Sequence, residues 1–289
     1  MDKKFIPLTY DKMFKMVLLS KEARSYLIDV ISLITKIPKD SIKKNITFKN
    51  NEHRLSAISE KKKISDLVVD VGNGVINIEM NKDYYDGLLD RNHDYISKIR
   101  NNIISEAKTY KDMKRVIQIN FDDFNIYKDK TILKFEMRDE SGIKEGVALE
   151  SYHVVLPNVR KKYYNKNADE LIRKLGILVM KNNKELEKLI EENMELRPVG
   201  KKMIEISRDE ELQGIYDGEE HERKVRNTLI ADAIEKGWYE GEEKGIEKGK
   251  RQSLEIVVKR MLKEKINIEI IEKISGLSKR EINDIENNM

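Results

Sequence analysis

Two carboxylates in one short segment are the side chains of this chain best suited to chemistry. Residues 64–81 read ISDLVVDVGNGVINIEMN, and polar residues alternate with apolar ones on both sides of a central Gly-Asn-Gly. Such alternation is typical of a β-hairpin, in which every second residue faces the same side. The hairpin predicts that Asp66 of its first strand and Glu79 of its second strand share one face.

The turn of this hairpin has two alternative positions. Asn73-Gly74 is a typical type I′ turn sequence, and a loop of these two residues would make Asp66 and Glu79 diagonal neighbours. A Gly72-Asn73 loop would instead place Asp66 directly opposite Glu79. Both registers bring the two carboxylates together on the same face.

Neighbouring carboxylates repel each other unless a positive charge lies between them or one of them is protonated. Mg²⁺ prefers oxygen ligands and is commonly held by one or two carboxylates together with water and phosphate. The hairpin therefore fits a magnesium site. It equally fits a solvent-facing sheet surface whose polar residues serve only solubility, and spacing alone does not decide between them.

The hairpin resembles the metal-binding motif of the PD-(D/E)xK nuclease superfamily, and specifically of its Rpn family of recombination-promoting nucleases and putative transposases. Asp66 matches the first acidic position, and Glu79-Met80-Asn81 matches the second motif. The resemblance extends over most of the chain, and Arg91, Tyr95 and Tyr110 stand at recognisable places. The further matching segments are residues 10–15, 91–110, 116–121, 220–249 and 276–278.

The resemblance implies an α/β fold, namely a restriction-endonuclease-like core with a mixed sheet flanked by helices, followed by a helical C-terminal region. It implies a metal-dependent DNA endonuclease that hydrolyses phosphodiester bonds and is linked to DNA recombination or mobile elements. Asp66, Glu79 and the backbone carbonyl of Met80 would bind Mg²⁺, with Mn²⁺ as the alternative ion, and Asn81 would complete the catalytic set. The alternative is a catalytically weakened nuclease fold that acts as a DNA-binding or oligomeric scaffold.

The residue at position 81 departs from the family pattern. Asn81 stands where the superfamily carries lysine and the Rpn branch usually carries glutamine. Asparagine donates a hydrogen bond but has no charge to stabilise a transition state, and it is one methylene shorter than glutamine. Lys82 does not replace it simply, because successive residues of a strand face opposite sides. Asp11 and Lys15 of the N-terminal helix are candidate accessory groups.

Charge is abundant but nearly balanced, since 56 Lys and Arg face 52 Asp and Glu for a formal net charge of +4. A uniformly basic DNA-binding surface is therefore not predicted, and DNA would be bound by local clusters. In a chain this rich in charge, such clusters also arise as solvated surface. The candidate DNA contacts are two basic runs, Lys61, Lys62 and Lys63 before the hairpin and Arg160, Lys161 and Lys162 after the core.

Composition excludes several other kinds of site. The chain has no cysteine, which excludes disulfides and thiolate metal sites, and its four histidines lack zinc-ligand spacing. No window approaches the roughly 18 apolar residues of a membrane span. We therefore expect no membrane partner and a cytoplasmic location.

Periodicity and turn residues predict the order of elements. Helices are expected over 9–20, 22–36 and 86–110, and strands over 46–48, 54–58, the hairpin, 116–121, 131–137 and 152–156. Helices predominate from residue 168, with an interruption at Pro198-Val199-Gly200. The expected organisation is a nuclease-like core at 1–160, a helical connector at 161–207, a long Gly/Glu/Lys-rich helix at 208–251 and a small helical unit at 252–289.

The long helix and the final unit each leave an alternative open. Glycines recur every four residues at Gly237, Gly241, Gly245 and Gly249. Each costs a helix about 1 kcal/mol relative to alanine, so this row indicates either a close helix–helix contact in a homo-oligomer or a charge-rich spacer. After the turn at Gly276, Ser278 is expected to cap a last helix, whose Lys279 and Arg280 would contact DNA in a helix-turn-helix or be simple surface residues.

Overall fold

The computed structural model of the chain describes residues 4–49, 67–107, 109, 112–145, 149–165 and 168–289. The chain divides into two compact units, Met1–Tyr216 and Asp217–Met289. Asp66, the basic run Lys61, Lys62 and Lys63, and the strand expected over 54–58 lie outside the described residues. No helix in the described part of the chain is both long enough and apolar enough to cross a membrane.

One mixed sheet organises the first unit. Its strands lie in the order β1-β2-β3-β4-β6-β5, and β3, β4 and β6 run parallel while the other pairs are antiparallel. The strands are β1 (Thr47–Phe48), β2 (Leu67–Asp70), β3 (Gly74–Asn81), β4 (Arg115–Asp122), β5 (Ile132–Glu136) and β6 (Leu149–Val155). This architecture confirms the predicted mixed sheet flanked by helices and is consistent with a restriction-endonuclease-like fold.

The β2–β3 hairpin has the second of the two predicted registers. Leu67 pairs with Ile78, and the Val71 N–H donates to the Gly74 carbonyl at 2.9 Å, so the loop is Gly72-Asn73. The expectation of a type I′ turn at Asn73-Gly74 is wrong, because only Gly72 of the loop has a positive φ, at 87°. A glycine with positive φ at the first loop position is typical of a type II′ turn.

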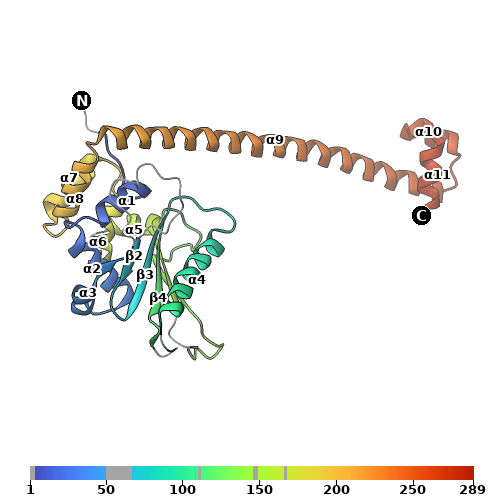
Figure 1. Cartoon of the computed structure of the whole chain (residues 1–289). Helices are drawn as coiled ribbons and strands as arrows, with labels where there is room; N and C mark the ends of the chain where they lie inside the picture. Colours follow the sequence, from blue (N-terminus) through green and yellow to red (C-terminus); the bar gives the residue numbers. More distant parts are fainter. Residues whose placement is uncertain (1–3, 50–66, 108, 110–111, 146–148, 166–167) are drawn as a thin grey trace. The chain divides into compact units, whose positions relative to one another are not determined.

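Helices cover the two faces of the sheet (Figure 1). One face packs against α1 (Asp11–Leu18) and α2 (Arg24–Thr35), where the rings of Phe14 and Phe121 lie 5.9 Å apart. The other face packs against α4 (Leu88–Glu106), whose Ile96 and Ile103 share a small apolar cluster with Val75 of β3. Because side chains alternate along a strand, α4 covers the face that also carries the odd-numbered polar residues of β3.

Of the remaining helices of the first unit, α3 (Lys39–Asn45) precedes the sheet in the chain and the others follow it. Those that follow are α5 (Leu156–Tyr163), α6 (Glu170–Leu175), the short 3-10 helix η2 (Gly176–Val179), α7 (Asn183–Glu192) and α8 (Arg197–Ile206). The interruption expected at Pro198-Val199-Gly200 is wrong, since these residues lie inside α8. Pro198 occupies the first turn, where its missing N–H costs nothing, and a Cβ on Gly200 would lie 2.2 Å from Ile190 Cγ2 of α7. The glycine therefore permits close helix packing.

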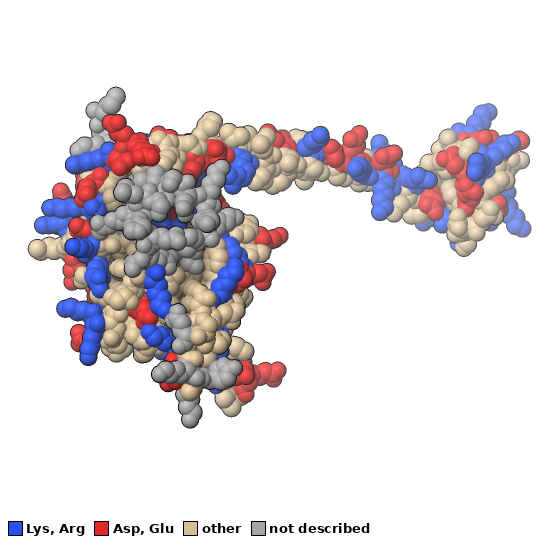
Figure 2. Space-filling view, in the orientation of Figure 1, with Lys and Arg blue, Asp and Glu red and all other residues tan. Residues whose placement is uncertain are grey.

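The second unit contains most of α9 (Glu210–Lys263), together with α10 (Ile268–Ser275) and α11 (Lys279–Asn287). Its core is formed by Val258, Ile271 and Ile282. Ser278 caps α11 as predicted, in a capping box with Glu281. Along α9, Lys and Arg are interspersed with Asp and Glu (Figure 2), and a Cβ on any of the four regularly spaced glycines would meet nothing within 4 Å. The homo-oligomer through this helix stays a prediction.

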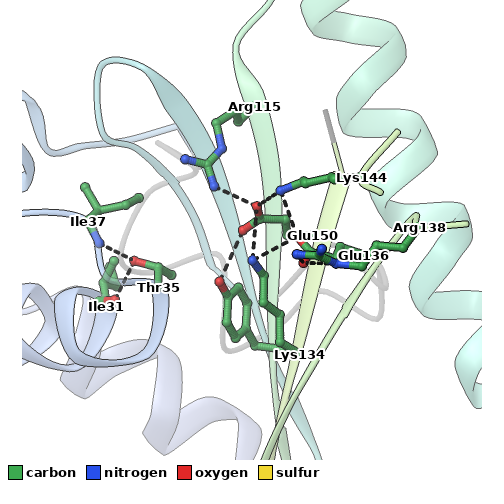
Figure 3. Close-up of polar contacts among 10 residues, drawn as sticks. Ile31, Thr35, Ile37, Arg115, Lys134, Glu136, Arg138, Lys144 and Glu150 are labelled. Carbon is green, nitrogen blue, oxygen red and sulfur yellow. Dashed lines mark hydrogen bonds and ion pairs between the residues drawn. The ribbon is translucent and has the colours of Figure 1, made fainter. Parts of the chain in front are cut away.

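A cluster of ion pairs holds β5 against β6 (Figure 3). Glu150 of β6 is opposite Glu136 of β5, and the Glu150 Oε1 atom lies 2.8 Å from Lys144 Nζ and 2.9 Å from Arg115 Nη2. Hydrogen bonds from Lys144, Lys134 and Arg138 lower the pKa of Glu136 to about 2. Burial raises the pKa of Glu150, but the surrounding cations outweigh that effect and the net direction is downward.

We expect this cluster to make folding stability depend on pH in the acid range. The pKa of Glu136 is about 2 in the folded chain against an ordinary 4.5, so its contribution is complete above about 4.5 and is lost as the pH falls towards about 2. The urea concentration at the midpoint of unfolding should therefore change less between about pH 6 and about pH 3 in Glu136→Gln than in the wild type. The exposed Glu140→Gln is the control, and an equal pH dependence in Glu136→Gln and the wild type would contradict the assignment.

Candidate functional site

Polar side chains form three paired rows across β3, β4 and β6, on the face that α4 covers. Parallel pairing fixes these rows, because it sets each residue of β3 beside one of β4 and each of β4 beside one of β6. The rows are Asn77–Gln118–Ser151, Glu79–Asn120–His153 and Asn81–Asp122–Val155. Apart from Ser151, every polar member is at most 6% exposed. Buried polar groups are costly without hydrogen bonds, so their partners define the site.

Asp122 joins the three strands through its carboxylate. Asn81 Nδ2 donates to Asp122 Oδ1 at 2.9 Å, and His153 Nδ1 lies 2.8 Å from Asp122 Oδ2. A carboxylate only accepts, so His153 carries a hydrogen on Nδ1, and in its neutral form Nε2 is an acceptor. Asn120 Nδ2 lies 3.3 Å from that nitrogen, and Gln118 Nε2 donates to Asn120 Oδ1 at 2.8 Å. Hydrogen bonds thus run from Gln118 through Asn120 and His153 to Asp122, and Asn81 donates to the same carboxylate from β3.

Two buried amide oxygens on the polar face, one of them on a residue that contacts Glu79, have no donor among the described residues. Asn77 Nδ2 donates to Glu79 Oε1 at 3.0 Å, which fixes that carboxylate. Asn77 Oδ1 and Gln118 Oε1, on paired residues, have no hydrogen-bond partner within the described part of the chain. Buried acceptors of this kind are usually satisfied by an ordered water or a cation. The polar face around Glu79 therefore has buried oxygens available to bind a water molecule or a cation.

Arg91 reaches Asn81 from the first turns of α4. Its Nη2 donates to Asn81 Oδ1 at 2.8 Å, and the guanidinium carbon lies 5.7 Å and 5.6 Å from the ring centres of Tyr85 and Tyr95. Both ends of the Asn81 amide are thus engaged, one by Arg91 and the other by Asp122. These contacts fix the orientation of a side chain that is 2% exposed.

The structure places Glu79 and Asn81 two residues apart on the polar face of β3. Between them, the Met80 side chain packs into the core of the opposite face, so only its backbone carbonyl is suited to bind a metal ion. Asp66, the expected partner of Glu79, lies outside the described residues. Within the described ranges no group of three or more His, Asp or Glu is arranged to hold a metal ion, so the two-carboxylate site stays a prediction.

The other candidates lie on other elements. Asp11 and Lys15 belong to α1, on the opposite face of the sheet, and the Lys15 Nζ atom is 3.5 Å from Asp11 Oδ2. Arg160 ties α5 to α7 through Glu185 at 3.0 Å, whereas Lys161 and Lys162 are exposed. Their role in binding DNA stays a prediction.

Sequence reasoning missed Asp122 and His153, and it noted Arg91 only as a matching position. A signal was present, because Gln118, Asn120 and Asp122 alternate with apolar residues just as the polar residues of β3 do. That pattern indicates a second polar strand, whereas sequence reasoning treated residues 116–121 only as a strand and considered no functional role for its polar residues.

Comparison with known protein families identifies the family of this chain. Residues 8–233 match the model of the PD-(D/E)XK nuclease family transposases, a range that includes the whole sheet and α4. The chain belongs to this family. Neither the search of curated proteins nor the search of solved structures found a match. Membership of the PD-(D/E)XK nuclease family transposases confirms the resemblance seen in the sequence, and the matched range ends within α9.

We expect Asp122→Ala to lower the free energy of unfolding by about 3 kcal/mol, because it leaves two buried donors without an acceptor. Urea denaturation followed by circular dichroism measures the change. Asp94→Ala removes an exposed carboxylate of α4 and should change stability by less than about 0.5 kcal/mol. A loss for Asp122→Ala no larger than that of this control would show that the Asp122 contacts do not stabilise the sheet.

Proposed function

We propose that this protein is a Mg²⁺-dependent DNA endonuclease that hydrolyses phosphodiester bonds during DNA recombination or the movement of mobile elements. Membership of a nuclease and transposase family supports a function of this general kind. The observation that carries the proposal is the position of Glu79 and Asn81, which share the polar face of a strand at the centre of the mixed sheet. These are the positions at which the family motif carries its second acid and its lysine.

The chemistry of the available donors fits a hard divalent cation. Glu79 offers a carboxylate, Met80 a backbone carbonyl, and Asn77 a buried carbonyl oxygen without a described donor. Asp66 would add a second carboxylate, because the sequence predicts it opposite Glu79 when the loop is Gly72-Asn73. All of these ligands are oxygens, which favour Mg²⁺ or Mn²⁺ over softer ions. PD-(D/E)XK nucleases in general use divalent metal ions.

In this proposal the protein orients the side chains that bind the metal ion and those that contact the substrate. When bound, the ion supplies Lewis-acid stabilisation and lowers the pKa of the attacking water. Asn77 holds the Glu79 carboxylate in place by donating to Oε1. The Asn81 amide nitrogen has two hydrogens, of which Asp122 accepts one, so the second can be donated to a phosphate oxygen or to water. Because Asp122 and Arg91 fix Asn81, that donor is oriented before substrate arrives.

The alternative function is a DNA-binding or oligomeric scaffold whose nuclease site has decayed. The observation that favours it is the uncharged side chain of Asn81, which lacks the positive charge of the usual lysine. Both functions use the same fold, so only a measurement of catalysis separates them.

Cleavage of supercoiled plasmid by the purified protein tests the proposal. We expect cleavage with Mg²⁺ or Mn²⁺ and none with EDTA, and a loss of at least about 100-fold in Asp66→Ala and in Glu79→Ala. Asp94→Ala on the surface of α4 is the control and should cleave at the wild-type rate. Cleavage that persists in both site variants would indicate a contaminating nuclease. DNA binding without cleavage by the wild type would support the scaffold instead.

A further inference from the structure

Hydrolysis of a phosphodiester builds up negative charge on the phosphate oxygens, and a nearby cation stabilises that charge. Asn81 carries no positive charge, but the positively charged side chain of Arg91 lies directly beside it. Arg91 Nη2 is 2.8 Å from Asn81 Oδ1, so the guanidinium of α4 and the amide of β3 form one hydrogen-bonded pair. Together the two side chains present a donor and a positive charge at the position that a lysine usually fills.

The Arg91 side chain is held firmly in this place. The residue follows the start of α4, where its backbone N–H donates to the Gly87 carbonyl at 2.9 Å. The rings of Tyr85 and Tyr95 lie beside its guanidinium, and the side chain is half-buried. A planar guanidinium held by aromatic rings loses little conformational freedom when it binds an oxyanion.

The partners that Arg91 has among the described residues do not neutralise its charge. Within the described residues its guanidinium donates to two uncharged amide oxygens, Asn81 Oδ1 and Asn92 Oδ1, and its buried Nε has no hydrogen-bond partner. Arg115 pairs with Glu150 at 2.9 Å and Arg160 with Glu185 at 3.0 Å, whereas no ion pair joins Arg91 to a carboxylate of the described residues. Arg91 thus has charge and donor capacity remaining for an external anion.

We propose that Arg91 binds a phosphate group of DNA together with Asn81, which it orients, and that it supplies the positive charge of this pair. The inference rests on the proposed nuclease function and adds to it a residue from a different element of the fold. It assigns to two side chains, one from β3 and one from α4, the work of the family's single lysine.

Exchange of charge between the two positions tests the assignment. Arg91→Gln keeps an amide donor for Asn81 Oδ1 and removes the charge, and it should lower the kcat of plasmid cleavage about 100-fold. Addition of Asn81→Lys to this variant should restore at least about tenfold, because it returns a cation to the same place. Lys98→Met, which removes an exposed cation of α4, is the control and should leave kcat unchanged. Further damage from Asn81→Lys in place of rescue would overturn the assignment.

DNA binding without cleavage gives a second readout. Affinity for a labelled duplex is measured in Ca²⁺ at several salt concentrations, and loss of one phosphate contact should reduce the slope of log K against log salt by about 0.9. We expect this reduction in Arg91→Gln, recovery in Arg91→Gln/Asn81→Lys, and a wild-type slope in both Lys98→Met and Arg91→Lys.

The two readouts separate failure of this inference from failure of the proposed function. A wild-type slope in Arg91→Gln overturns the role of Arg91, whether or not the protein cleaves DNA. If the slopes are as expected but the wild-type protein cleaves no DNA, the proposed nuclease function is overturned and the phosphate contact of Arg91 is supported. Absence of measurable duplex binding by the wild type overturns both. If Arg91→Gln does not fold, Arg91→Met provides the uncharged variant.

Discussion

The buried carboxylate of Asp122 is the constraint on which the polar face of the sheet depends. A carboxylate that is 1% exposed must be surrounded by donors, and it obtains them from Asn81 on β3 and His153 on β6. One side chain of the middle strand thereby sets the orientation of groups on both of its neighbours. The site residues of β3 are thus fixed by the strands beside it as well as by their own hairpin.

Local patterns were sufficient to predict the central hairpin and the long helix after it, but not the contacts between elements. Alternation identified the β2–β3 hairpin, and helical periodicity identified α4, because both patterns depend on near neighbours in sequence. The loop was ambiguous, since Gly72, Asn73 and Gly74 permit two registers, and the positive φ of Gly72 decided between them. The prediction of a helix interruption at Pro198 was wrong, because a proline that ends one helix and a proline that begins another look alike in sequence.

Parallel pairing explains why the rest of the site could not be predicted. Asn81 and Asp122 are 41 residues apart, and no periodicity reports which strands become neighbours across a crossover. The contact of Arg91 with Asn81 likewise depends on how α4 returns over the sheet. The sequence contained both polar strands and the arginine, whereas their convergence is a property of the folded chain.

The charged residues of β5 have an effect beyond the ion pairs that they form. β5 is the last strand at one edge of the sheet, and exposed edges attract unpaired strands of other molecules. Lys134 and Glu136 lie on this edge strand within a network of four cations and two carboxylates. A strand from another molecule that paired with β5 would have to place its own side chains against these charges. The network therefore also disfavours edge-to-edge aggregation.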